Sequence, residues 1–521
     1  MSLTAVLLVE IQVTSPTGVV STLRFSDRAI PPMPPTDALR PNARFDSRVL
    51  EAPAIRRMLF ENLETLSPAR GVGALTLTNA GAALSDYEGY AWGEMAVWLW
   101  VQGTPSAEAR LVMRGLCDQP AFTPATAGQA GRVQVALYDY RREASKAVQS
   151  VLYAGSNDGE AVLYEGAADG LKDTPKPLAW GDLTGAQIPA PQVNAAEQAH
   201  QLHDGPIEGA VALFDRGGDF GLDMDGDESG AAFDAAAPDP AHAVTDLGRG
   251  LVKFNADPVG VFTAGFKGDA AGGYVQTAGP ILARILARAG VPPARIGASF
   301  AALASAAVIG FYAGQPILLE EALRFVGAGA PAAVLPDREG VWQAVPWGPP
   351  QATPDYTLAW TDIVTAPASD PVGAPIGEVR VGYGRIWQTF AGAELSPDLV
   401  GETAQAALAA EYRWAVEPDA GVKARFPAGS WRTVEIRTAL RAEADARALA
   451  QSLKALLALK DDGRPRRAWR ITVPVEIALD RQLGQTIAVS YPPENLSGNF
   501  LLIGEEPFRP GPRLAVLTVW G

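Results

Sequence analysis

The chain is poor in the residues that build most catalytic and metal centres. Among its 521 residues there is one cysteine, Cys117, and there are three histidines. A single cysteine excludes a disulfide within the chain, and it excludes a zinc or iron–sulfur site held by several thiolates of this chain. Cys117 is therefore expected to be a small buried apolar residue. Three histidines also allow few arrangements of a nucleophile with its base.

The chain is short of basic residues as well. Lysine and arginine number 43 against 58 aspartates and glutamates, which gives a net charge of −15 and a pI of about 4.8. Proteins that bind nucleic acids neutralise phosphates with clustered lysine and arginine, so no specific nucleic-acid binding is expected. Two interpretations of the acidity remain open. An acidic wall would let a DNA duplex slide through a conduit, whereas excess acidic residues in general aid solubility.

No apolar run predicts a membrane span. A long uncharged stretch, residues 296–319, is interrupted by glycines and by Pro316. It predicts a buried helix near 300–308, a turn, and a helix that begins at Pro316. No stable membrane insertion is therefore expected. The first ten residues lack a basic region and a cleavage site, so they predict a first strand instead of a signal peptide.

Glycine and proline are plentiful, with 53 and 42 residues, and this composition is typical of many short elements joined by turns. Apolar and alternating runs predict strands at residues 6–13, 19–25, 74–78, 95–101, 109–116, 132–138, 209–214, 259–266, 379–383, 431–438, 469–475, 487–491, 501–503 and 514–520. Periodic apolar residues predict helices at 280–289, 317–326 and 441–458, and residues 336–340 predict a hairpin turn.

These elements predict a β-rich α+β fold with several domains, made of small β-barrels or sandwiches and a few covering helices. Four parts are expected, with the following bounds. They are a β-rich domain over 1–170, an extended linker and strand with an acidic insert over 171–250, an α+β domain over 251–375, and a β-barrel with one helix over 376–521.

Two motifs resemble metal sites. His200, His203 and Asp204 have ligand chemistry, but the Asp-Gly turn that follows places the histidines at a strand end, where their side chains point apart. Oxygen ligands at alternate positions from Asp223 resemble a calcium loop. The sixth position of that loop, however, is Glu228 instead of glycine. A solvated acidic loop is the favoured interpretation, and the motif's residues are Asp223, Asp225, Asp227, Ser229 and Asp234.

Catalytic motifs are missing. The chain has no glycine-rich phosphate loop with a following Lys-Ser/Thr, no His-Glu-x-x-His and no Gly-x-Ser-x-Gly. Adjacent acids such as Glu320–Glu321 and Asp461–Asp462 point to different faces of a helix, so they are poor acid/base partners. No catalytic, cofactor-binding or metal-ligating residue is assigned, and the chain is expected not to be an enzyme.

Read in order, the segments resemble the tail hub (tail tip or baseplate hub) proteins of long-tailed bacteriophages and gene transfer agents. The stretches that carry the resemblance are 73–79 with Asp86-Tyr87 and Gly89-Tyr90, 110–115 with 132–141, 176–181 with 201–205 and 211–215, 258–264 with 281–290, and 380–387 with 449–457 and 483–491. The order and spacing of these stretches carry the resemblance over most of the chain.

The resemblance implies a virion protein at the distal end of the tail, made in the bacterial host cytoplasm. It implies a homotrimer in which two similar barrels per subunit form a ring of six, which docks on the hexameric tail tube and narrows to threefold symmetry. One barrel is expected in the first ~170 residues and one in the last ~145. The implied partners are the distal tail or tube ring, a downstream fibre or receptor-binding protein and the tape measure protein, with DNA passing through the lumen.

The chain departs from the family in two respects. The chain stops at Trp520-Gly521, so receptor binding is expected on another protein, and Cys117 alone cannot hold the iron–sulfur cluster of some tail tips.

Two other functions compete with the tail hub. The first rival is a tail-associated carbohydrate-binding or cell-wall-degrading protein, in which exposed tryptophans stack on sugars. Its candidate residues are Trp342, Trp347 and Trp360. The second rival is a secretion-system spike hub of the same architecture.

Overall fold

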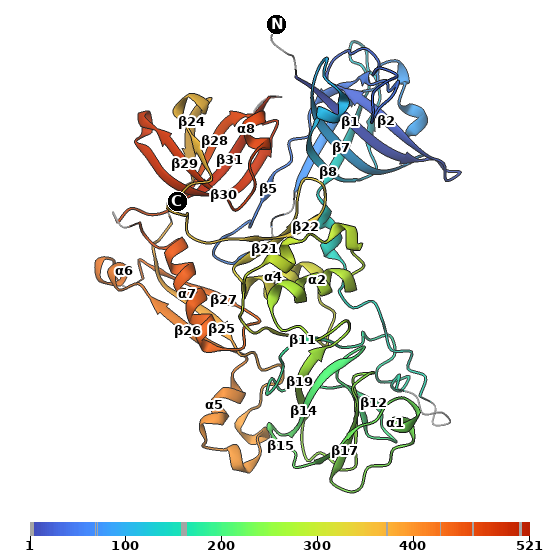
Figure 1. Cartoon of the computed structure of the whole chain (residues 1–521), viewed down its shortest axis with the longest axis vertical. Helices are drawn as coiled ribbons and strands as arrows, with labels where there is room; N and C mark the ends of the chain where they lie inside the picture. The colour runs from blue at the N-terminus through green and yellow to red at the C-terminus, as the bar shows by residue number, and fades with distance from the viewer. Residues whose placement is uncertain are drawn as a thin grey trace. The chain divides into compact units, whose positions relative to one another are not determined.

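The computed structural model describes residues 5–67, 69, 71–157, 164–370, 373–427, 429–460, 463–509 and 513–521. Over these residues the chain is β-rich, with several sheets and a few short helices (Figure 1), which confirms the predicted fold class. It forms two compact units, and each unit draws on separate stretches of the chain. Unit 1 consists of Met1–Ala144, Val334–Gly373 and Leu459–Gly521, and unit 2 consists of Ser145–Ala333 and Ala374–Ala458.

The N-terminal barrel of unit 1 is a single sheet whose ends meet. Its strands, in spatial order, are β2 (Val20–Ser26), β1 (Ala5–Thr14), β7 (Ala91–Val101), β8 (Arg110–Cys117), β10 (Arg132–Tyr138) and β6 (Val72–Thr78). The two short strands β3 (Asp46–Ser47) and β4 (Val49–Glu51) join the ends of this sheet. Between them, the Arg48 N–H donates to the Ser26 carbonyl at 3.1 Å, and the Arg48 carbonyl accepts from the Thr78 N–H at 2.9 Å. One residue therefore connects both edges of the sheet.

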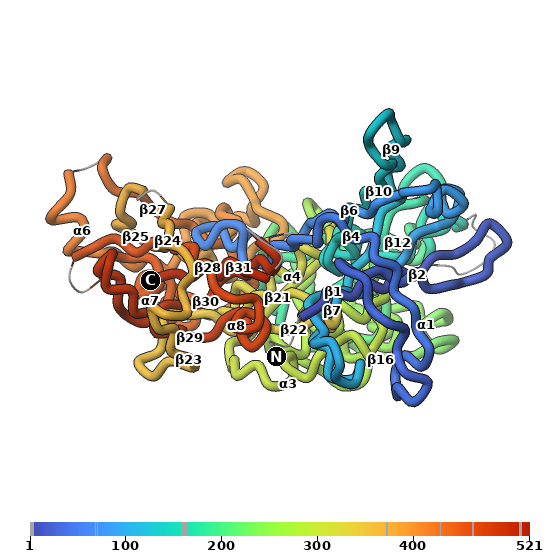
Figure 2. Tube along the Cα trace, turned by 90° about the horizontal axis from the view of Figure 1, so that it is seen from above, coloured from blue at the N-terminus to red at the C-terminus, as the bar shows by residue number. Residues whose placement is uncertain are grey.

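Alternation in the sequence explains the core of this barrel. Val133 and Val135 on β10 are fully buried while Arg132 and Gln134 are exposed, and on the neighbouring β6 Leu75 and Leu77 are fully buried. Such a period of two is what one buried sheet face requires. The β1–β2 hairpin and the short strand β9 (Ala121–Thr123), which pairs with β10, extend from the body of the barrel (Figure 2).

The second sheet of unit 1 is built mainly from the end of the chain, and it is named the C-terminal barrel here because its strand order repeats that of the N-terminal barrel. Its strands, in spatial order, are β23 (Tyr356–Leu358), β29 (Thr486–Tyr491), β30 (Leu496–Pro507), β31 (Leu514–Trp520), β28 (Ala468–Pro474) and β24 (Thr365–Ser369). The segment 356–369 supplies both end strands, and the helix α8 (Val475–Leu479) connects β28 to β29. Ile471 and Val473, opposite Leu517 and Ala515, place their side chains in its core.

A buried ion cluster holds this barrel to two neighbouring segments of unit 1. The Glu505 carboxylate on β30 is 2.5 Å from an Arg57 guanidinium nitrogen on β5 (Arg57–Met58), and it also pairs with Arg338. Arg338 lies in the turn between β21 (Ala332–Pro336) and β22 (Trp342–Pro346), where the sequence predicts a hairpin. All three side chains are buried. Arg338 also donates to the carbonyls of Leu479 and Ala478, at 3.0 Å each.

Unit 2 begins with three small sheets. The first sheet pairs β11 (Leu178–Gly181) with β20 (Gly310–Ala313). The second contains, in spatial order, β12 (Gln192–Asn194), β13 (Ala199–Gln201), β18 (Leu251–Phe254), β17 (His242–Asp246) and β16 (Asp223–Asp227). The third contains β15 (Gly218–Asp219), β14 (Ile207–Asp215) and β19 (Phe262–Asp269). Four helices accompany them: α1 (Ala231–Ala235), α2 (Ala278–Arg288), α3 (Ser299–Ala302) and α4 (Leu319–Ala328). On α2, Ile281, Leu282, Ile285 and Leu286 are fully buried, as their spacing predicts.

A fourth sheet completes unit 2. It consists of β26 (Arg413–Pro418), β25 (Ile376–Tyr383) and β27 (Arg432–Arg437), and the helix α7 (Glu443–Leu457) packs on β25 and β26. The short helices α5 (Thr403–Ala409) and α6 (Ala420–Arg425) lie in its connections. The chain beyond residue 376 thus contributes to both units, and α7 covers the sheet of unit 2.

The expectation for residues 296–319 is wrong in part. The helix there is only the four-residue α3, residues 310–313 form the strand β20, and α4 begins at Leu319 instead of Pro316. Gly310 sits so close to the Asp182 carbonyl that a Cβ at this position would collide with it. The β11–β20 pairing therefore overrides local helix propensity. In the described part of the chain, no helix combines the length and the apolar character that a membrane crossing needs.

Candidate functional site

The two histidines of the first metal motif lie in different surroundings. His200 on β13 is buried, and its ring stacks on Phe254 at 5.2 Å and contacts Phe262 at 4.5 Å. Its Nδ1 donates to the Ala190 carbonyl at 3.0 Å. Burial lowers the pKa of His200 to about 4, so the ring is neutral at physiological pH. His200 is therefore a core residue.

His203 serves the neighbouring sheet. Its Nδ1 accepts the Ala179 N–H at 2.9 Å, and its Nε2 lies 3.7 Å from Asp269. Asp269 also pairs with Arg284 at 2.6 Å, while Asp204 pairs with Arg288. Both ring nitrogens are thus engaged by protein groups. The arrangement joins the β13–β14 loop to β19 and α2, and its role is structural.

The acidic insert is a paired strand with its own hydrogen bonds. β16 runs parallel to β17, and all five of its residues are exposed. Asp225 pairs with His242 at 2.6 Å, and Asp227 accepts the Leu247 N–H at 2.8 Å. Asp234 pairs with Arg249 at 2.7 Å. Among the residues that the structure describes, no group of three or more His, Cys, Asp or Glu side chains is placed to hold a metal ion.

A buried lysine that the sequence did not single out stabilises this insert. The Lys253 ammonium is 1% exposed and bonds Glu197 at 2.9 Å. It also donates to the carbonyls of Phe233 and Ala236, each at 3.1 Å, at the C-terminal end of α1. A positive charge is favourable at this end of a helix. The only sequence signal was a lysine inside an apolar strand, Leu251–Phe254.

The tryptophans proposed for sugar stacking divide into two kinds. Trp342 and Trp347 are 1% and 5% exposed, and Trp347 packs edge-on against Phe60. They belong to the core of unit 1, so the expectation that they stack on sugars is wrong for this pair. Trp360 is 54% exposed. Of the acid pairs, Glu320 and Glu321 lie in the first turn of α4, and Asp461–Asp462 fall outside the described residues.

Cys117 at the end of β8 is buried, as expected. Burial raises the pKa of its thiol to about 12, with smaller contributions from Asp118 and Glu94. The thiolate is the reactive form, so we expect a disulfide reagent to label the native protein more than about 100-fold more slowly than the urea-unfolded chain at mildly alkaline pH. The rate of thionitrobenzoate release measures this. Equal rates would mean that Cys117 is accessible.

The two barrels of unit 1 share one strand arrangement. Five strands in each lie in the order β4-β6-β10-β8-β7 and β24-β28-β31-β30-β29, and every neighbouring pair is antiparallel. The order along the chain is also the same. In the C-terminal barrel, β23 runs parallel to β29 and leads into β24, whereas in the N-terminal barrel β3 runs parallel to β2 and leads into β4. In strand order, the N-terminal barrel therefore corresponds to the C-terminal one with the β1–β2 hairpin inserted between β3 and β7.

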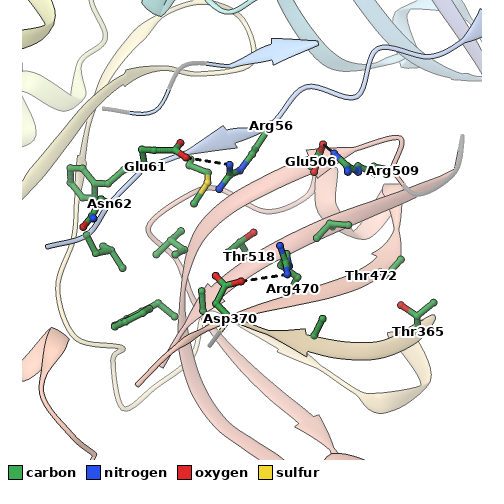
Figure 3. A pocket seen from close by; sticks show the side chains of 18 of the residues that line it. Arg56, Glu61, Asn62, Thr365, Asp370, Arg470, Thr472, Glu506, Arg509 and Thr518 are labelled. Atoms are coloured by element: carbon green, nitrogen blue, oxygen red, sulfur yellow. Dashed lines mark hydrogen bonds and ion pairs between the residues drawn. The ribbon is translucent and has the colours of Figure 1, made fainter. Parts of the chain in front are cut away.

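A groove of about 610 Å³ lies on the outer face of the C-terminal barrel (Figure 3). Its floor consists of residues from β24, β28, β30 and β31, and the segment 56–64 forms one wall. Asp370 and Arg470 form an ion pair of 3.4 Å on the floor, and Arg56 and Glu61 form one of 3.5 Å on the wall. The wall segment is held in place by Arg57, which reaches Glu505 below it.

No protein-family model matches the chain, and no curated protein sequence matches it. The solved structures that resemble it include the 43 kDa tail protein of prophage MuSo2 from Shewanella oneidensis, with 11% identity, a TM-score of 0.38 and 98% of each chain covered. The tail protein from Neisseria meningitidis MC58 has 11% identity and a TM-score of 0.37, with 98% of this chain and 96% of that chain covered. Prophage tail protein gp18 from Listeria monocytogenes EGD-e has 8% identity and a TM-score of 0.33, with 98% and 94% covered.

Proposed function

We propose that this chain is a structural protein of a phage tail and forms a homotrimeric hub at the tail's distal end. The observation that carries the proposal is the repeated five-strand arrangement of the two barrels in unit 1. It agrees with the ordered resemblance of the sequence segments to tail hubs. In this role the chain acts through shape and self-association and not through catalysis.

The repeated barrel gives a physical route between two symmetries. Three copies around an axis present six barrels of one strand arrangement, which suits docking on a hexameric tube. The β1–β2 hairpin is present in only one barrel of each chain, so the six positions remain alternately different and the ring keeps threefold symmetry. Closed rings of this kind arise when one surface patch of a subunit repeatedly meets a different patch of the next.

The barrels also suit a permanent assembly. A sheet whose ends meet leaves few unpaired strand edges, so uncontrolled edge-to-edge association is limited. The net charge of −15 would keep a DNA duplex from adhering to the lumen of such a ring. The expected neighbours are the distal tail tube ring on one side and a fibre or receptor-binding protein on the other, with the tape measure protein as a third.

Mass photometry and electron microscopy of the full-length chain test the proposal. We expect a particle of three times the 54.7 kDa chain mass, with class averages that show threefold symmetry and six barrel-shaped densities. Since large permanent interfaces do not dissociate on dilution, the trimer should persist at nanomolar concentration. A particle of one chain mass throughout a dilution series would refute the hub.

A further inference from the structure

The tip of the β1–β2 hairpin, residues 15–20, is apolar and exposed. Val19 and Val20 are each 63% exposed. Residues 11–23 contain no charged side chain, in a chain whose net charge is −15. The Ser15 N–H donates to the Val19 carbonyl at 2.9 Å, and the Val19 N–H donates to the Ser15 hydroxyl at 3.0 Å. These hydrogen bonds order the tip, so it presents two valines in a fixed position.

The outer edge of β2 is unprotected as well. β1 pairs with β2 along residues 20–26, whereas β3 pairs only with Phe25 and Ser26. Among the residues that the structure describes, residues 20–24 therefore have a neighbouring strand on one side only. Proteins usually guard such an edge with charges, proline or a bulge, and residues 20–23 contain no charge, no proline and no shift in register. We therefore expect a second protein surface to cover this edge in an assembled particle.

The groove on the C-terminal barrel has a complementary character. Three arginines and four carboxylates line it, and three ion pairs join them, so their charges nearly cancel. A strongly charged partner gains little from such a lining, whereas an uncharged apolar segment suits it. The lining also contains six large apolar side chains, those of Met58, Phe60, Leu63, Ile503, Val516 and Trp520.

The hairpin lies far from the groove of its own chain. In Figures 1 and 2 it points to one side of unit 1, and the C-terminal barrel of the same unit lies on the other side. An ion pair of 2.6 Å between Arg110 and Asp480 and a hydrogen bond of 2.6 Å from Arg513 to the Ala5 carbonyl connect the two barrels. In a ring of three chains, however, each N-terminal barrel also adjoins the C-terminal barrel of the next chain.

We propose that the hairpin tip of one copy docks in the groove on the C-terminal barrel of the next copy. This inference rests on the proposed homotrimer, and it names the contact that closes the ring. A projection on one surface that meets a hollow on a different surface is a head-to-tail contact, and three such contacts close a threefold ring. Docking removes Val19 and Val20 from water. Because the tip is already ordered, binding costs little conformational entropy.

The double variant Val19→Asp with Val20→Asp tests the contact in the full-length protein. Mass photometry should show single chains at nanomolar concentrations at which the unchanged protein is a trimer, a loss of trimer stability of at least about 100-fold. The matched control is Val259→Asp with Val261→Asp, which places two acids on exposed valines of unit 2 and should leave the trimer intact. Circular dichroism and the urea midpoint establish that each variant is folded before its mass is compared.

Cross-linking between copies tests which surfaces meet. A chain with Val20→Cys on the hairpin and Ala368→Cys in the groove is treated with a short bismaleimide. We expect covalent dimers and trimers on a denaturing gel, because the two cysteines of one chain are too far apart to react with each other. Thr123→Cys on β9, combined with Ala368→Cys, is the control pair and should stay monomeric on the gel. The native Cys117 is buried and does not compete.

The outcomes separate this contact from the hub itself. A single chain at every concentration would overturn both. A trimer that survives the two aspartates on the hairpin, or one whose hairpin and groove cysteines do not cross-link, would overturn the contact and leave the hub standing. Loss of the trimer in the Val259 and Val261 control to the same extent would also overturn the contact, since any added charge would then have the effect.

Discussion

Replacing Glu505 with glutamine is expected to lower the free energy of unfolding of unit 1 by about 3–5 kcal/mol, the usual cost of breaking a buried ion pair from one side. Glu505 is 3% exposed, and its two oxygens face two buried guanidinium groups, those of Arg57 and Arg338. Glutamine has almost the same shape, so packing is retained. The loss arises because two buried positive charges then have no neutralising partner.

Urea unfolding followed by tryptophan fluorescence measures this effect. Glu506 provides a matched control, since it is the next residue of β30 and its partner Arg509 is in solvent: the two side chains are 17% and 65% exposed. Glu506→Gln is expected to change the free energy of unfolding by less than about 1 kcal/mol, as is usual for exposed pairs. Equal losses for the two variants would mean that burial of the Glu505 cluster contributes nothing.

A double variant separates the charge effect from other causes. Arg57→Met alone leaves Glu505 with one partner and removes a hydrogen bond of 3.0 Å to the Pro336 carbonyl. If the pair interacts directly, Glu505→Gln combined with Arg57→Met costs less than the sum of the two single changes. If the losses in free energy of unfolding of the two single variants simply add, the two side chains do not interact, and the destabilisation arises from other contacts in unit 1.

Local structure was predictable wherever one face of an element is buried. The strands predicted at residues 6–13 and 19–25 correspond to β1 and β2, with small shifts at their ends. The helix predicted at residues 280–289 corresponds to α2. In these segments the repeat of apolar residues and the turn residues at the ends agree. The prediction for residues 296–319 was wrong in part because residues 310–313 pair with β11, which lies more than 100 residues earlier in the chain.

Long-range features could not be derived from the sequence in the same way. The pairing of Arg57 with Glu505 joins residues 448 positions apart, and neither residue has a local signal. The closure of the N-terminal barrel depends on the backbone of Arg48, and the Arg48 guanidinium adds a hydrogen bond to the Thr78 carbonyl at 3.3 Å. The groove is assembled from three stretches of chain. The acidic motif, in contrast, lies within one short stretch of sequence. The predicted exposure of this stretch matches that of β16, whose five residues are all exposed.

Acidification is expected to destabilise unit 2 through His200. The folded-state pKa of this ring is about 4, whereas its unfolded-state pKa is near 6.5, because burial penalises the charged form. The unfolded chain therefore binds the proton first as the pH falls. The stabilisation that the neutral ring provides is complete above pH 6.5 and is lost progressively down to pH 4, by roughly 3 kcal/mol in total.

A comparison of His200→Gln with the unchanged protein isolates this effect from the carboxylates, which titrate in both. The difference in free energy of unfolding between them should shrink as the pH falls from 7 to 4.5, because the variant has no ring to protonate.

His242 is the opposite case. Its pKa is raised by the hydrogen bond to Asp225, so the contribution of His242 is greatest at low pH and disappears as the pH rises through its folded-state pKa. His242→Gln should accordingly show a difference of opposite pH dependence. A slope of the same sign for both variants would mean that the pH response does not arise from the burial of His200.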